Sequence, residues 1–361
     1  MKILYITTIG STMDFFKSFI KNQLDIGNHI DIATNENDGR TKVATCYREW
    51  GCQVFHIDTS RSPISFGNIR AIKQIRDIVS NRRYNIVHCH TPLAAMATRI
   101  ACKKLRKNGL KVIYTVHGFH FYTGAPLMSW LIYYPIEKWL SKYTDVLITI
   151  NKEDYNRAKK NFYSSRIEYI PGVGINLEKF KYKKENGEKI RAELRINNKR
   201  TMLLSVGELN KNKNHEIVIR AIKDIPNITY VIVGRGELGA RLLNVANEYN
   251  VDLKLVGYRT DVEEFYSAAD VYILPSIREG LNVSLMEAMA SGVACCASKI
   301  RGNEDLIDKP LFRPSSMNDV KYAIRNALDN RDDLIKDNVE KINGFRFEKI
   351  NKMLNDVYST I

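Results

Sequence analysis

The stretch VYILPSIREGLNVSLMEAMASGVACCAS, residues 271–298, decides the fold class of this chain. It contains two short apolar runs, Val271–Leu274 and Val293–Ala297, which are separated by a polar loop and a helix-length segment. Short, nearly continuous apolar runs are typical of parallel strands that are covered on both faces. Gly292 stands where that helix would end. The stretch therefore predicts a strand, a loop, a helix and a second strand in succession.

The same succession recurs in two blocks along the 361 residues. The first block has apolar runs at Ile3–Thr8, His29–Thr34, Val54–Ile57, Ile86–His90, Val112–His117 and Val146–Ile150. The second block has them at Met202–Val206, Thr229–Val233, Leu253–Val256, Val271–Leu274 and Val293–Ala297. Alternation of strands with helix-length segments predicts an α/β protein with two facing, doubly wound, Rossmann-like domains.

A block rich in Lys, Glu and Asn, residues 178–200, separates the two halves of the sequence. We place the domain boundary just before it, so that residues 1–174 form the first domain and residues 175–344 the second. Residues 345–361 have apolar side chains at helical spacing, which predicts a C-terminal helix that returns to the first domain. Doubly wound sheets bind ligands at the carboxyl ends of their strands, so we expect the site in the cleft between the two domains.

The composition excludes several classes of protein. With 44% hydrophobic and 26% charged residues the chain can bury real cores, which excludes wholesale disorder. No secretory signal opens the sequence, and no apolar stretch reaches the length of a membrane-spanning helix. The six cysteines include no C-x-x-C pair, which indicates reduced thiols in a cytoplasmic protein rather than a disulfide framework or a zinc site.

The positive charge is concentrated in the first half of the chain. The formal net charge is +15, and residues 1–180 contain 26 Lys and Arg against 14 Asp and Glu. Such a surface suits a nucleic acid, an anionic membrane or a phosphorylated ligand. The sequence lacks the aromatic-interleaved basic motif of a nucleic-acid-binding module, which disfavours the first of these partners.

Two glutamates flank the start of the helix that follows Val271–Leu274. Glu279 and Glu287 are eight positions apart, so on one helix they would not share a face. If the helix begins near Asn282 or Ser284, Glu279 lies in the loop before it and Glu287 about one turn inside it. The unpaired N–H groups of the first turn then form an anion site between two carboxylates, which can accept hydrogen bonds from a diol. The alternative is that neither residue binds a ligand: Glu279 is then a charged loop residue, and Glu287 an acidic residue favoured by the helix dipole.

Three other clusters end predicted strands. Gly207–Glu216 contains Lys213, which can bind a phosphate as a point charge, although Lys- and Asn-rich loops are more often merely solvated. His117 is the last residue of the run Val112–His117, and its neutral imidazole can donate or accept a hydrogen bond. The backbone can also satisfy a histidine at the end of a strand, which is equally the alternative for His120. Gly10, after the first strand, resembles a phosphate-binding turn, but a single glycine is a weak signal.

The sequence also lacks several common ligand motifs. It contains no D-x-D pair for a divalent ion, no G-x-x-x-x-G-K-[ST] loop, and no G-x-G-x-x-G in its first half. Gly234, Gly236 and Gly239 match the last pattern in letters, but no acidic residue ends a following strand at the expected place.

Together these motifs resemble the retaining family 4 glycosyltransferases of the GT-B fold. The resemblance is strongest over Val206–Asn214, Gly234–Gly236, Gly257–Asp261 and Ala269–Gly292, and weaker at His117-Gly118 and Pro171–Ile175. It implies two Rossmann-like domains, the first binding the acceptor and the second the nucleotide sugar. Particular substitutions, Asn214 and Asn282 for the usual glycine or proline, resemble a bacterial subgroup that assembles capsule, exopolysaccharide or O-antigen.

The resemblance also implies roles for individual residues. Glu279 would bind hydroxyls of the donor sugar, Lys213 would neutralise the diphosphate, and His117 would lie beside the transferred sugar. These three are the candidate catalytic residues. The implied donor-binding residues are Gly10, Gly207, Lys213, Gly234, Tyr258, Arg259, Glu279, Gly280, Leu281, Asn282, Val283 and Glu287. No metal ion and no cofactor are expected.

Within this set, Glu287 would hold the ribose diol, Tyr258 and Arg259 the base, and Gly10 would let its loop close over the phosphates. The family often has arginine where this chain has Glu208. A carboxylate cannot bind phosphate, so Lys213 would contribute more of the positive charge.

The function that follows is transfer of a hexosyl or N-acetylhexosaminyl group from a UDP-sugar to a polyprenyl-diphosphate-linked saccharide during bacterial surface polysaccharide synthesis. Basic residues would contact anionic lipid on the cytoplasmic face of the inner membrane, and the aromatic stretch Phe119–Tyr134 would meet an acyl or polyprenyl chain. These basic residues are Arg82, Arg83, Lys103, Lys104, Arg106, Lys107 and Lys111. Solvated helix faces and a buried aromatic helix are the alternative. A sugar-nucleotide epimerase of the same fold and, less favoured, a nucleic-acid-binding protein are the rival functions.

Overall fold

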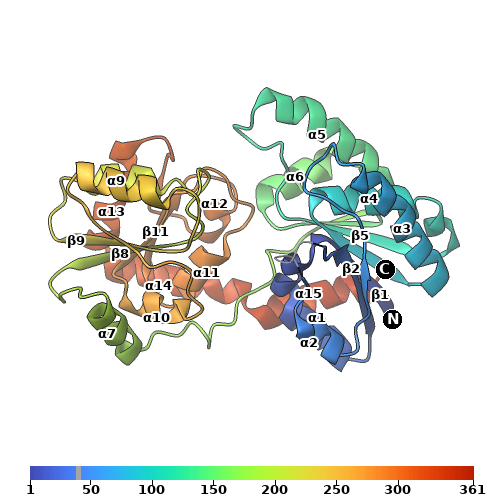
Figure 1. Cartoon of the computed structure of the whole chain (residues 1–361), viewed down its shortest axis with the longest axis horizontal. Coiled ribbons are helices and arrows are strands. Elements are labelled where there is room, and N and C mark those ends of the chain that lie inside the picture. Colours follow the sequence, from blue (N-terminus) through green and yellow to red (C-terminus); the bar gives the residue numbers. More distant parts are fainter. Residues whose placement is uncertain (38–41) are drawn as a thin grey trace. The chain divides into compact units, whose positions relative to one another are not determined.

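The computed structural model describes residues 1–37 and 42–361. The chain divides into two compact units (Figure 1). Unit 1 consists of Met1–Val173 and Ile350–Ile361, and unit 2 of Gly174–Lys349. Unit 2 is thus an insertion between the main part of unit 1 and its last twelve residues.

Unit 1 is built on a seven-stranded sheet with the order β3-β2-β1-β4-β5-β6-β7. All pairings between these strands are parallel. The strands are β1 (Lys2–Ile9), β2 (His29–Asn35), β3 (Val54–His56), β4 (Ile86–His90), β5 (Lys111–Val116), β6 (Val146–Thr149) and β7 (Arg166–Tyr169). The order reverses between β1 and β4, so the carboxyl ends of these two strands form the switch point at which open α/β sheets bind ligands.

Helices cover both faces of this sheet. Along β1, Leu4 and Ile6 belong to a core with helices α3 and α4, whereas the intervening Tyr5 contacts α15 on the opposite face. Because both faces are covered, successive residues of the strand are all buried, which explains the continuous apolar runs of the sequence. The helices of unit 1 are α1 (Lys17–Asp25), α2 (Thr45–Glu49), α3 (Gly67–Arg82), α4 (Pro92–Cys102), α5 (Leu127–Leu140), α6 (Lys152–Asn161) and α15 (Phe347–Ser359), with 3-10 turns η1 (Gly10–Phe16), η2 (Leu105–Asn108) and η3 (Ser141–Tyr143).

Unit 2 repeats the plan with a six-stranded sheet of order β10-β9-β8-β11-β12-β13, again paired in parallel. Its strands are β8 (Thr201–Val206), β9 (Ile228–Val233), β10 (Asp252–Leu255), β11 (Val271–Leu274), β12 (Ala294–Ser298) and β13 (Leu311–Phe312). Its helices are α7 (Lys184–Glu193), α8 (His215–Ile222), α9 (Gly239–Glu248), α10 (Val262–Ala268), α11 (Val283–Ala290), α12 (Asn303–Leu306), α13 (Met317–Asp329) and α14 (Arg331–Ile342), followed by the turn η4 (Asn343–Phe345). Two separate apolar cores lie on its two faces.

The predicted fold class is confirmed. Both units are α/β with parallel, doubly wound sheets, and the C-terminal helix returns to unit 1. Tyr358 of α15 makes a 2.6 Å hydrogen bond with Tyr5 of β1, which fixes the helix on that sheet. The strands β7 and β13 were not predicted from the sequence, and both are edge strands of their sheets.

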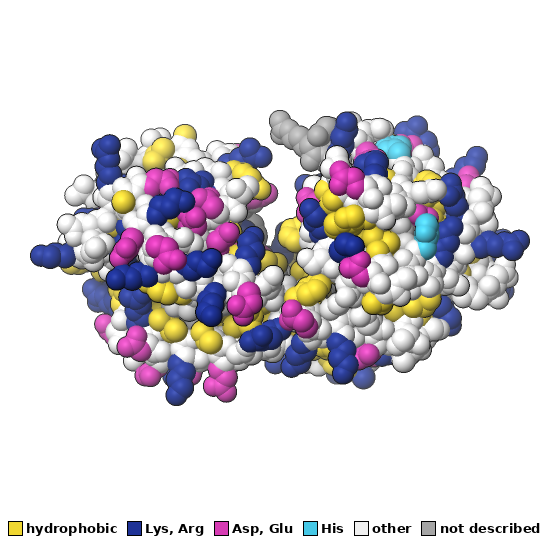
Figure 2. Space-filling view, turned by 90° about the horizontal axis from the view of Figure 1, so that it is seen from below, with side chains coloured by type: hydrophobic (Ala, Val, Ile, Leu, Met, Phe, Trp, Pro, Cys, Tyr) yellow, Lys and Arg dark blue, Asp and Glu magenta, His cyan; other side chains and the backbone are white. Residues whose placement is uncertain are grey.

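The surface charge is mixed. Figure 2 shows basic and acidic side chains interspersed on the face that it presents. Among residues 1–37 and 42–361, none of the helices combines the length and the apolar character that crossing a membrane would require.

Candidate active site

The start of α11 in unit 2 is fixed by a side-chain cap. Asn282 is the N-cap residue, and its Oδ1 accepts hydrogen bonds from the Leu285 N–H (3.1 Å) and from Ser284 Oγ (2.7 Å). The helix therefore begins where the sequence predicted, and Val283 is its first residue. Backbone N–H groups in the first turn of a helix have no acceptor within the helix, and the helix dipole adds positive potential there. Gly280 and Leu281 lie in the loop immediately before this end.

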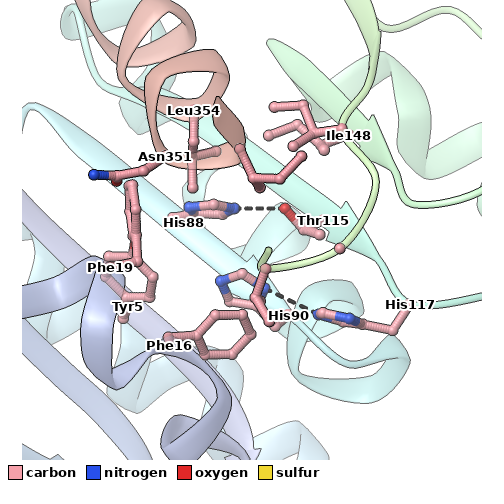
Figure 3. A pocket seen from close by; sticks show the side chains of 14 residues that line it. Tyr5, Phe16, Phe19, His88, His90, Thr115, His117, Ile148, Asn351 and Leu354 are labelled. Atoms are coloured by element: carbon pink, nitrogen blue, oxygen red, sulfur yellow. Dashed lines mark hydrogen bonds between the residues drawn. The ribbon is translucent and has the colours of Figure 1, made fainter. Parts of the chain in front are cut away.

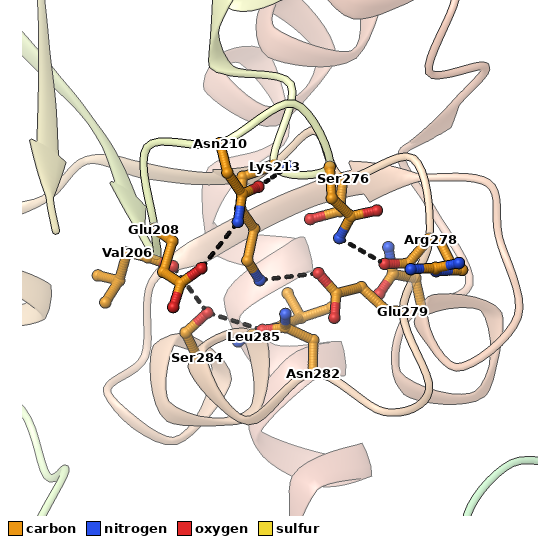
Figure 4. Close-up of polar contacts among 12 residues, drawn as sticks. Val206, Glu208, Asn210, Lys213, Ser276, Arg278, Glu279, Asn282, Ser284 and Leu285 are labelled. Atoms are coloured by element: carbon orange, nitrogen blue, oxygen red, sulfur yellow. Dashed lines mark hydrogen bonds and ion pairs between the residues drawn. The ribbon is translucent and has the colours of Figure 1, made fainter. Parts of the chain in front are cut away.

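Glu279 and Lys213 form an ion pair in front of this helix (Figure 4). Lys213 Nζ lies 2.7 Å from Glu279 Oε1, and their side chains are 18% and 14% exposed. The two residues come from loops that follow adjacent strands, β8 and β11. The Ile277 N–H donates to the Asn212 carbonyl (2.8 Å), which ties the two loops together. An incoming diphosphate can compete for the ammonium and leave the carboxylate free to accept from hydroxyls.

Hydrogen bonds within its loop hold Lys213 in place. Lys213 lies directly before α8, whose N-cap residue is Asn214 in a left-handed conformation with φ of 56°. Asn210 Oδ1 accepts from the Lys213 N–H (3.0 Å), and Asn210 Nδ2 donates to Glu208 Oε2 (2.8 Å). Glu208 thus shapes the loop that presents the lysine.

Glu287 lies one turn inside α11 and is largely buried. Burial raises the pKa of its carboxyl group to about 7, and the nearby Glu263 raises it further, against the lowering effects of a hydrogen bond and of Lys179. The hydrogen bond is donated by the Tyr266 hydroxyl to Glu287 Oε2 (2.8 Å). Glu287 is therefore partly ionised at neutral pH, and one of its oxygens is already engaged.

The backbone segments that follow β8 and β9 approach each other closely beside Lys213 and Glu279. Gly207 and Gly234 end β8 and β9, and the Gly207 N–H donates to the Val233 carbonyl (2.9 Å). A Cβ atom on Gly234 would lie 1.8 Å from the Gly207 carbonyl oxygen, and the φ of Gly234 is +154°. Only glycine fits at position 234, because any side chain would push these strand ends apart.

In the predicted base-binding loop, Arg259 is held in ion pairs, whereas Tyr258 is exposed. Arg259 pairs with Asp261 at 2.7 Å and with Glu193 of α7 at 2.6 Å, so its charge is neutralised within unit 2. Tyr258 is 68% exposed, and the guanidinium of Arg235 lies 5.4 Å from its ring centroid. The geometry leaves Tyr258 as the side chain of this loop that can stack on a base.

The two remaining candidates, Gly10 and His117, belong to unit 1. Gly10 is buried and begins η1 directly after β1. His117 follows β5 and is exposed to solvent, and its Nε2 lies 3.2 Å from Nδ1 of His90. The other eleven predicted site residues belong to unit 2.

Sequence analysis missed residues that support the site from behind. The Arg301 Nε donates to the Glu279 carbonyl (3.3 Å), and a Cβ on Gly302 would lie 2.1 Å from the Gly280 carbonyl oxygen. The loop after β12 therefore supports the loop that holds Glu279. Gly302 follows a predicted strand, but no spacing rule links it to a loop 22 residues earlier.

Unit 1 contains a pocket of about 540 Å³ at its β1/β4 switch point. Its floor is polar: Thr8 near the end of β1 and Thr91 directly after β4 share a 2.7 Å hydroxyl hydrogen bond. Arg61 and His120 also line it. Its walls are mainly apolar, formed by Ile9, Pro63, Pro92, Leu93, Met96, Ile132, Tyr133 and Ile136, with Glu137 at one edge.

The aromatic stretch beside this pocket is only partly as predicted. Phe119 and Phe121 are buried, and Trp130 and Tyr134 pack against the same core, so most of the aromatic side chains are structural. Aliphatic side chains of α5 are exposed instead, because they occupy its outer face. The exposed apolar residues of α5 are Leu127, Met128, Leu131, Ile132, Ile136 and Trp139.

Two family models match the chain. "Glycosyltransferase Family 4" matches residues 17–179, and "Glycosyl transferases group 1" matches residues 186–341. The first match covers most of unit 1 and the first six residues of unit 2, and the second lies within unit 2. Together they span most of both units.

Relatives with assigned names agree with these matches. The chain is 35% identical over 315 residues to EpsD of Bacillus subtilis (strain 168), which is named as a glycosyltransferase, covering 85% of this chain and 81% of that protein. It is 30% identical over 316 residues to the UDP-Gal:alpha-D-GlcNAc-diphosphoundecaprenol alpha-1,3-galactosyltransferase of Escherichia coli, covering 81% of each.

Solved structures share the fold at lower identity. Anabaena HepE, crystallised with UDP and glucose, matches with a TM-score of 0.82 and 16% identity over the whole of both chains. The sucrose-phosphate synthase of Thermosynechococcus elongatus matches with a TM-score of 0.80 and 18% identity, covering 99% of this chain and 98% of that one. These likenesses concern the arrangement of strands and helices.

Proposed function

The chain belongs to the glycosyltransferases of family 4 and group 1, with the GT-B fold, and from this premise we propose that it transfers a sugar from a UDP-sugar to a lipid-linked saccharide with retention of configuration. The acceptor would be polyprenyl-diphosphate-linked, and the product would serve bacterial surface polysaccharide synthesis. The observation on which this proposal mainly depends is the Lys213–Glu279 pair at the N-terminus of α11.

The donor proposal follows from the chemistry of that pair. A nucleoside diphosphate needs positive charge, which Lys213 and the first-turn N–H groups of α11 supply without a metal ion. Glu279, once released from Lys213, accepts hydrogen bonds from the donor sugar, and Glu287 accepts from the ribose diol. The E. coli relative uses UDP-Gal, and HepE was crystallised with UDP, which supports uridine diphosphate as the leaving group.

The chemistry would be driven mainly by stabilisation of the departing diphosphate. As the bond between the anomeric carbon and the phosphate oxygen breaks, negative charge accumulates on the diphosphate, and Lys213 and the helix dipole oppose it. The acceptor hydroxyl would attack from the same face, which retains the configuration, and its proton would pass to the leaving phosphate oxygen. Tyr258 would stack on the base, and His117 would contact the transferred sugar.

The acceptor proposal rests on unit 1. The pocket at the β1/β4 switch point combines a hydroxyl-rich floor with apolar walls, as an amphipathic ligand requires. The exposed apolar face of α5 borders this pocket, since Ile132 and Ile136 belong to both. We propose that the saccharide lies over Thr8 and Thr91 and that the lipid runs along α5. The name of the E. coli relative, which acts on a diphosphoundecaprenol-linked sugar, supports this class of acceptor.

Contact with an anionic membrane would bring enzyme and acceptor together. Lys103, Lys104 and Lys107 are exposed near the C-terminal end of α4 and in the residues that follow it. Arg106 is engaged with Asp145 at 2.7 Å, so the free charge comes from the lysines. Each basic residue near an anionic surface contributes on the order of 1 kcal/mol to binding.

A panel of UDP-sugars, tested with and without a polyprenyl-diphosphate-linked saccharide, examines the reaction directly. We expect UDP release and a lengthened saccharide only when donor and acceptor are both present. Interconversion of UDP-sugars without acceptor would instead identify an epimerase. A panel in which no UDP-sugar is bound or consumed would contradict the donor proposal.

Vesicle co-sedimentation tests the membrane contact. The protein should pellet with vesicles that contain phosphatidylglycerol and remain in solution with phosphatidylcholine alone. Leu131→Ser should weaken this binding, whereas Leu243→Ser, which changes a similarly exposed leucine on α9, should not. Equal behaviour of the two variants would remove α5 from the proposal.

A further inference from the structure

Three histidine side chains lie in a row on the face of the unit 1 sheet that α15 covers (Figure 3). His88 and His90 are two positions apart on β4, so they point to the same face. His117 follows β5, in which Thr115 pairs with His90. The ring centroids are 4.2 Å apart for His88 and His90 and 5.5 Å apart for His90 and His117. The row therefore leads from the buried interior to an exposed candidate site residue.

His88 has a structural role that its contacts explain completely. Its Nδ1 lies 2.6 Å from the Tyr358 hydroxyl of α15, and its Nε2 lies 2.8 Å from Thr115 Oγ1. Burial lowers the pKa of its imidazole to about 3, so the ring is neutral at physiological pH. Both nitrogens are engaged away from His117, and His88 fastens the C-terminal helix to the sheet.

His90 has the contacts of a residue that orients another. Its Nδ1 is 3.2 Å from Nε2 of His117, and only 1% of the residue is exposed. The ring of Phe16 packs on it with centroids 4.1 Å apart, which prevents rotation. Burial lowers the pKa of His90 well below its usual value, and the neighbouring histidines lower it further, so this ring is neutral as well. A neutral imidazole has one donor and one acceptor nitrogen, so the hydrogen bond fixes which nitrogen of His117 holds its proton.

The other nitrogen of His90 borders a small cavity. About 30 Å³ of this cavity is open to the centres of water molecules, which is enough for one or two of them. His90 Nε2 and Asn351 Oδ1 are buried atoms of its lining residues, and neither has a hydrogen-bond partner among the described residues. Leaving two such atoms unpaired would cost free energy. Asn351 Oδ1 can only accept, so a water that satisfies it must donate, and its second O–H is available to an acceptor nitrogen.

We propose that His90 is a positioning residue for His117, and that water in this cavity sets the direction of the hydrogen bond between them. The water donates to Asn351 Oδ1 and His90 Nε2, and the Nδ1–H of His90 donates to His117 Nε2. His117 then has its own proton on Nδ1 and offers an N–H donor to an oxygen of the transferred sugar. The part of this inference that concerns catalysis rests on the proposed function, whereas the tautomer is a property of the protein alone.

Three variants distinguish a role of His90 in positioning His117 from a role in packing the core. His90→Phe keeps the aromatic contact with Phe16 but removes both nitrogens, and we expect kcat to fall roughly 10–100-fold with little change in the KM of the donor. His90→Asn retains an N–H near the place of Nδ1 and should recover much of this loss. Tyr358→Phe removes hydrogen bonds of His88 and Tyr5 but touches neither His90 nor His117, so kcat should be unchanged. Wild-type kcat in His90→Phe would overturn the proposal.

The tautomer is read by nitrogen NMR on protein labelled in its histidine side chains, with His117→Asn used to assign the signal. Wild-type His117 should be protonated on Nδ1, and Asn351→Leu, which removes the acceptor for the water, should shift the population towards the other tautomer. Protonation of wild-type His117 on Nε2 would refute the inference. Because this measurement needs no substrate, its outcome is independent of whether the donor and acceptor proposals hold.

Discussion

Two ion pairs, one in each unit, differ in how completely the protein surrounds their charges. In unit 1, Arg99 of α4 donates two hydrogen bonds to Glu137 of α5, at 2.8 and 3.1 Å, and its side chain is completely buried. The ring of Tyr114 lies below the same guanidinium at 4.4 Å. In unit 2, Lys213 and Glu279 share a single contact and both remain accessible.

The two ion pairs differ in whether solvent or another ion can reach their charged groups. Arg99 has no access to solvent and its donors are all directed at protein groups, so it can only hold two helices together. Lys213 and Glu279 lie before the start of α11 and are partly exposed, so a competing ion can reach them. A single, accessible pair costs little to open, whereas a bidentate buried pair is strongly unfavourable to break from one side.

The largest expected effect comes from breaking the buried pair. Glu137→Ala should lower the free energy of unfolding of unit 1 by about 3–5 kcal/mol, because Arg99 is left charged and buried without a partner. Urea denaturation followed by circular dichroism measures this change. The double variant Arg99→Met/Glu137→Leu should be much less destabilised than the single one. A single variant with wild-type stability would show that the pair is as dispensable as a surface contact.

Breaking the accessible pair should affect activity more than stability. Lys213→Ala should lower kcat by roughly 10²–10³-fold, because the leaving diphosphate loses its nearest cation. The unfolding midpoint should fall less than in Glu137→Ala, since Glu279 remains partly exposed and water can reach its charge. Lys211→Ala, which removes an exposed lysine from the same loop, is the matched control. If both variants turn over equally, the ion pair is not part of the donor site.

Titration should reveal opposite contributions from His88 in unit 1 and Glu287 in unit 2. Burial lowers the pKa of His88 from 6.5 to about 3 in folded unit 1. The unfolded chain therefore binds more protons at this group between these values, and His88 makes unit 1 gain stability as the pH rises through that window. Glu287 has its pKa raised from 4.5 to about 7, so it makes unit 2 lose stability as the pH rises from 4.5 to 7. Burial of His215, which lowers its pKa to about 4, acts in the opposite direction within unit 2.

Hydrogen exchange resolved by peptide at pH 5 and 6.5, corrected for intrinsic rates, follows the stability of both units in one experiment. Each contribution is on the order of a few kcal/mol across its window. Glu287→Gln removes the opposing contribution, so the stability of unit 2 should rise with pH more steeply than in the wild-type protein, and unit 1 should be unchanged. An unaltered pH dependence of unit 2 in this variant would contradict the role assigned to Glu287.

The smallest effect is expected at an exposed pair. Arg313 and Asp319 approach to 2.6 Å near the start of α13, and the Arg313 side chain is 72% exposed. Arg313→Ala should leave the unfolding free energy almost unchanged, since water competes for both charges. The same denaturation assay measures it, and a loss as large as that of Glu137→Ala would mean that exposure does not separate the pairs.

The sequence allowed the order of strands and helices to be predicted, because buried parallel strands leave continuous apolar runs such as Ile86–His90. It did not reveal β7, whose residues Arg166–Tyr169 include two charged side chains, or β13, which has only two residues. Edge strands are covered on fewer sides and need fewer apolar residues, so this signal is weak for them.

The sequence allowed the residues of the candidate site to be proposed, but it did not predict which of them contact each other. The start of α11 followed from Asn282 and the apolar spacing after it, since capping is a local effect. The pairing of Lys213 with Glu279 spans 66 positions and depends on β8 and β11 being neighbours, which no local pattern encodes. His90 was overlooked because a strand buried on both faces hides which of its residues share a face with His117.

The path of the chain has a consequence for its biosynthesis. Strands β1 and β4 leave the ribosome early, but α15, which covers Tyr5 and His88, is translated only after the whole of unit 2. The part of the first sheet around Tyr5 and His88 therefore lacks the cover of α15 while about half of the protein is still being made. A nascent chain in this state offers chaperones an apolar surface, and a premature stop codon before Ile350 would make that exposure permanent.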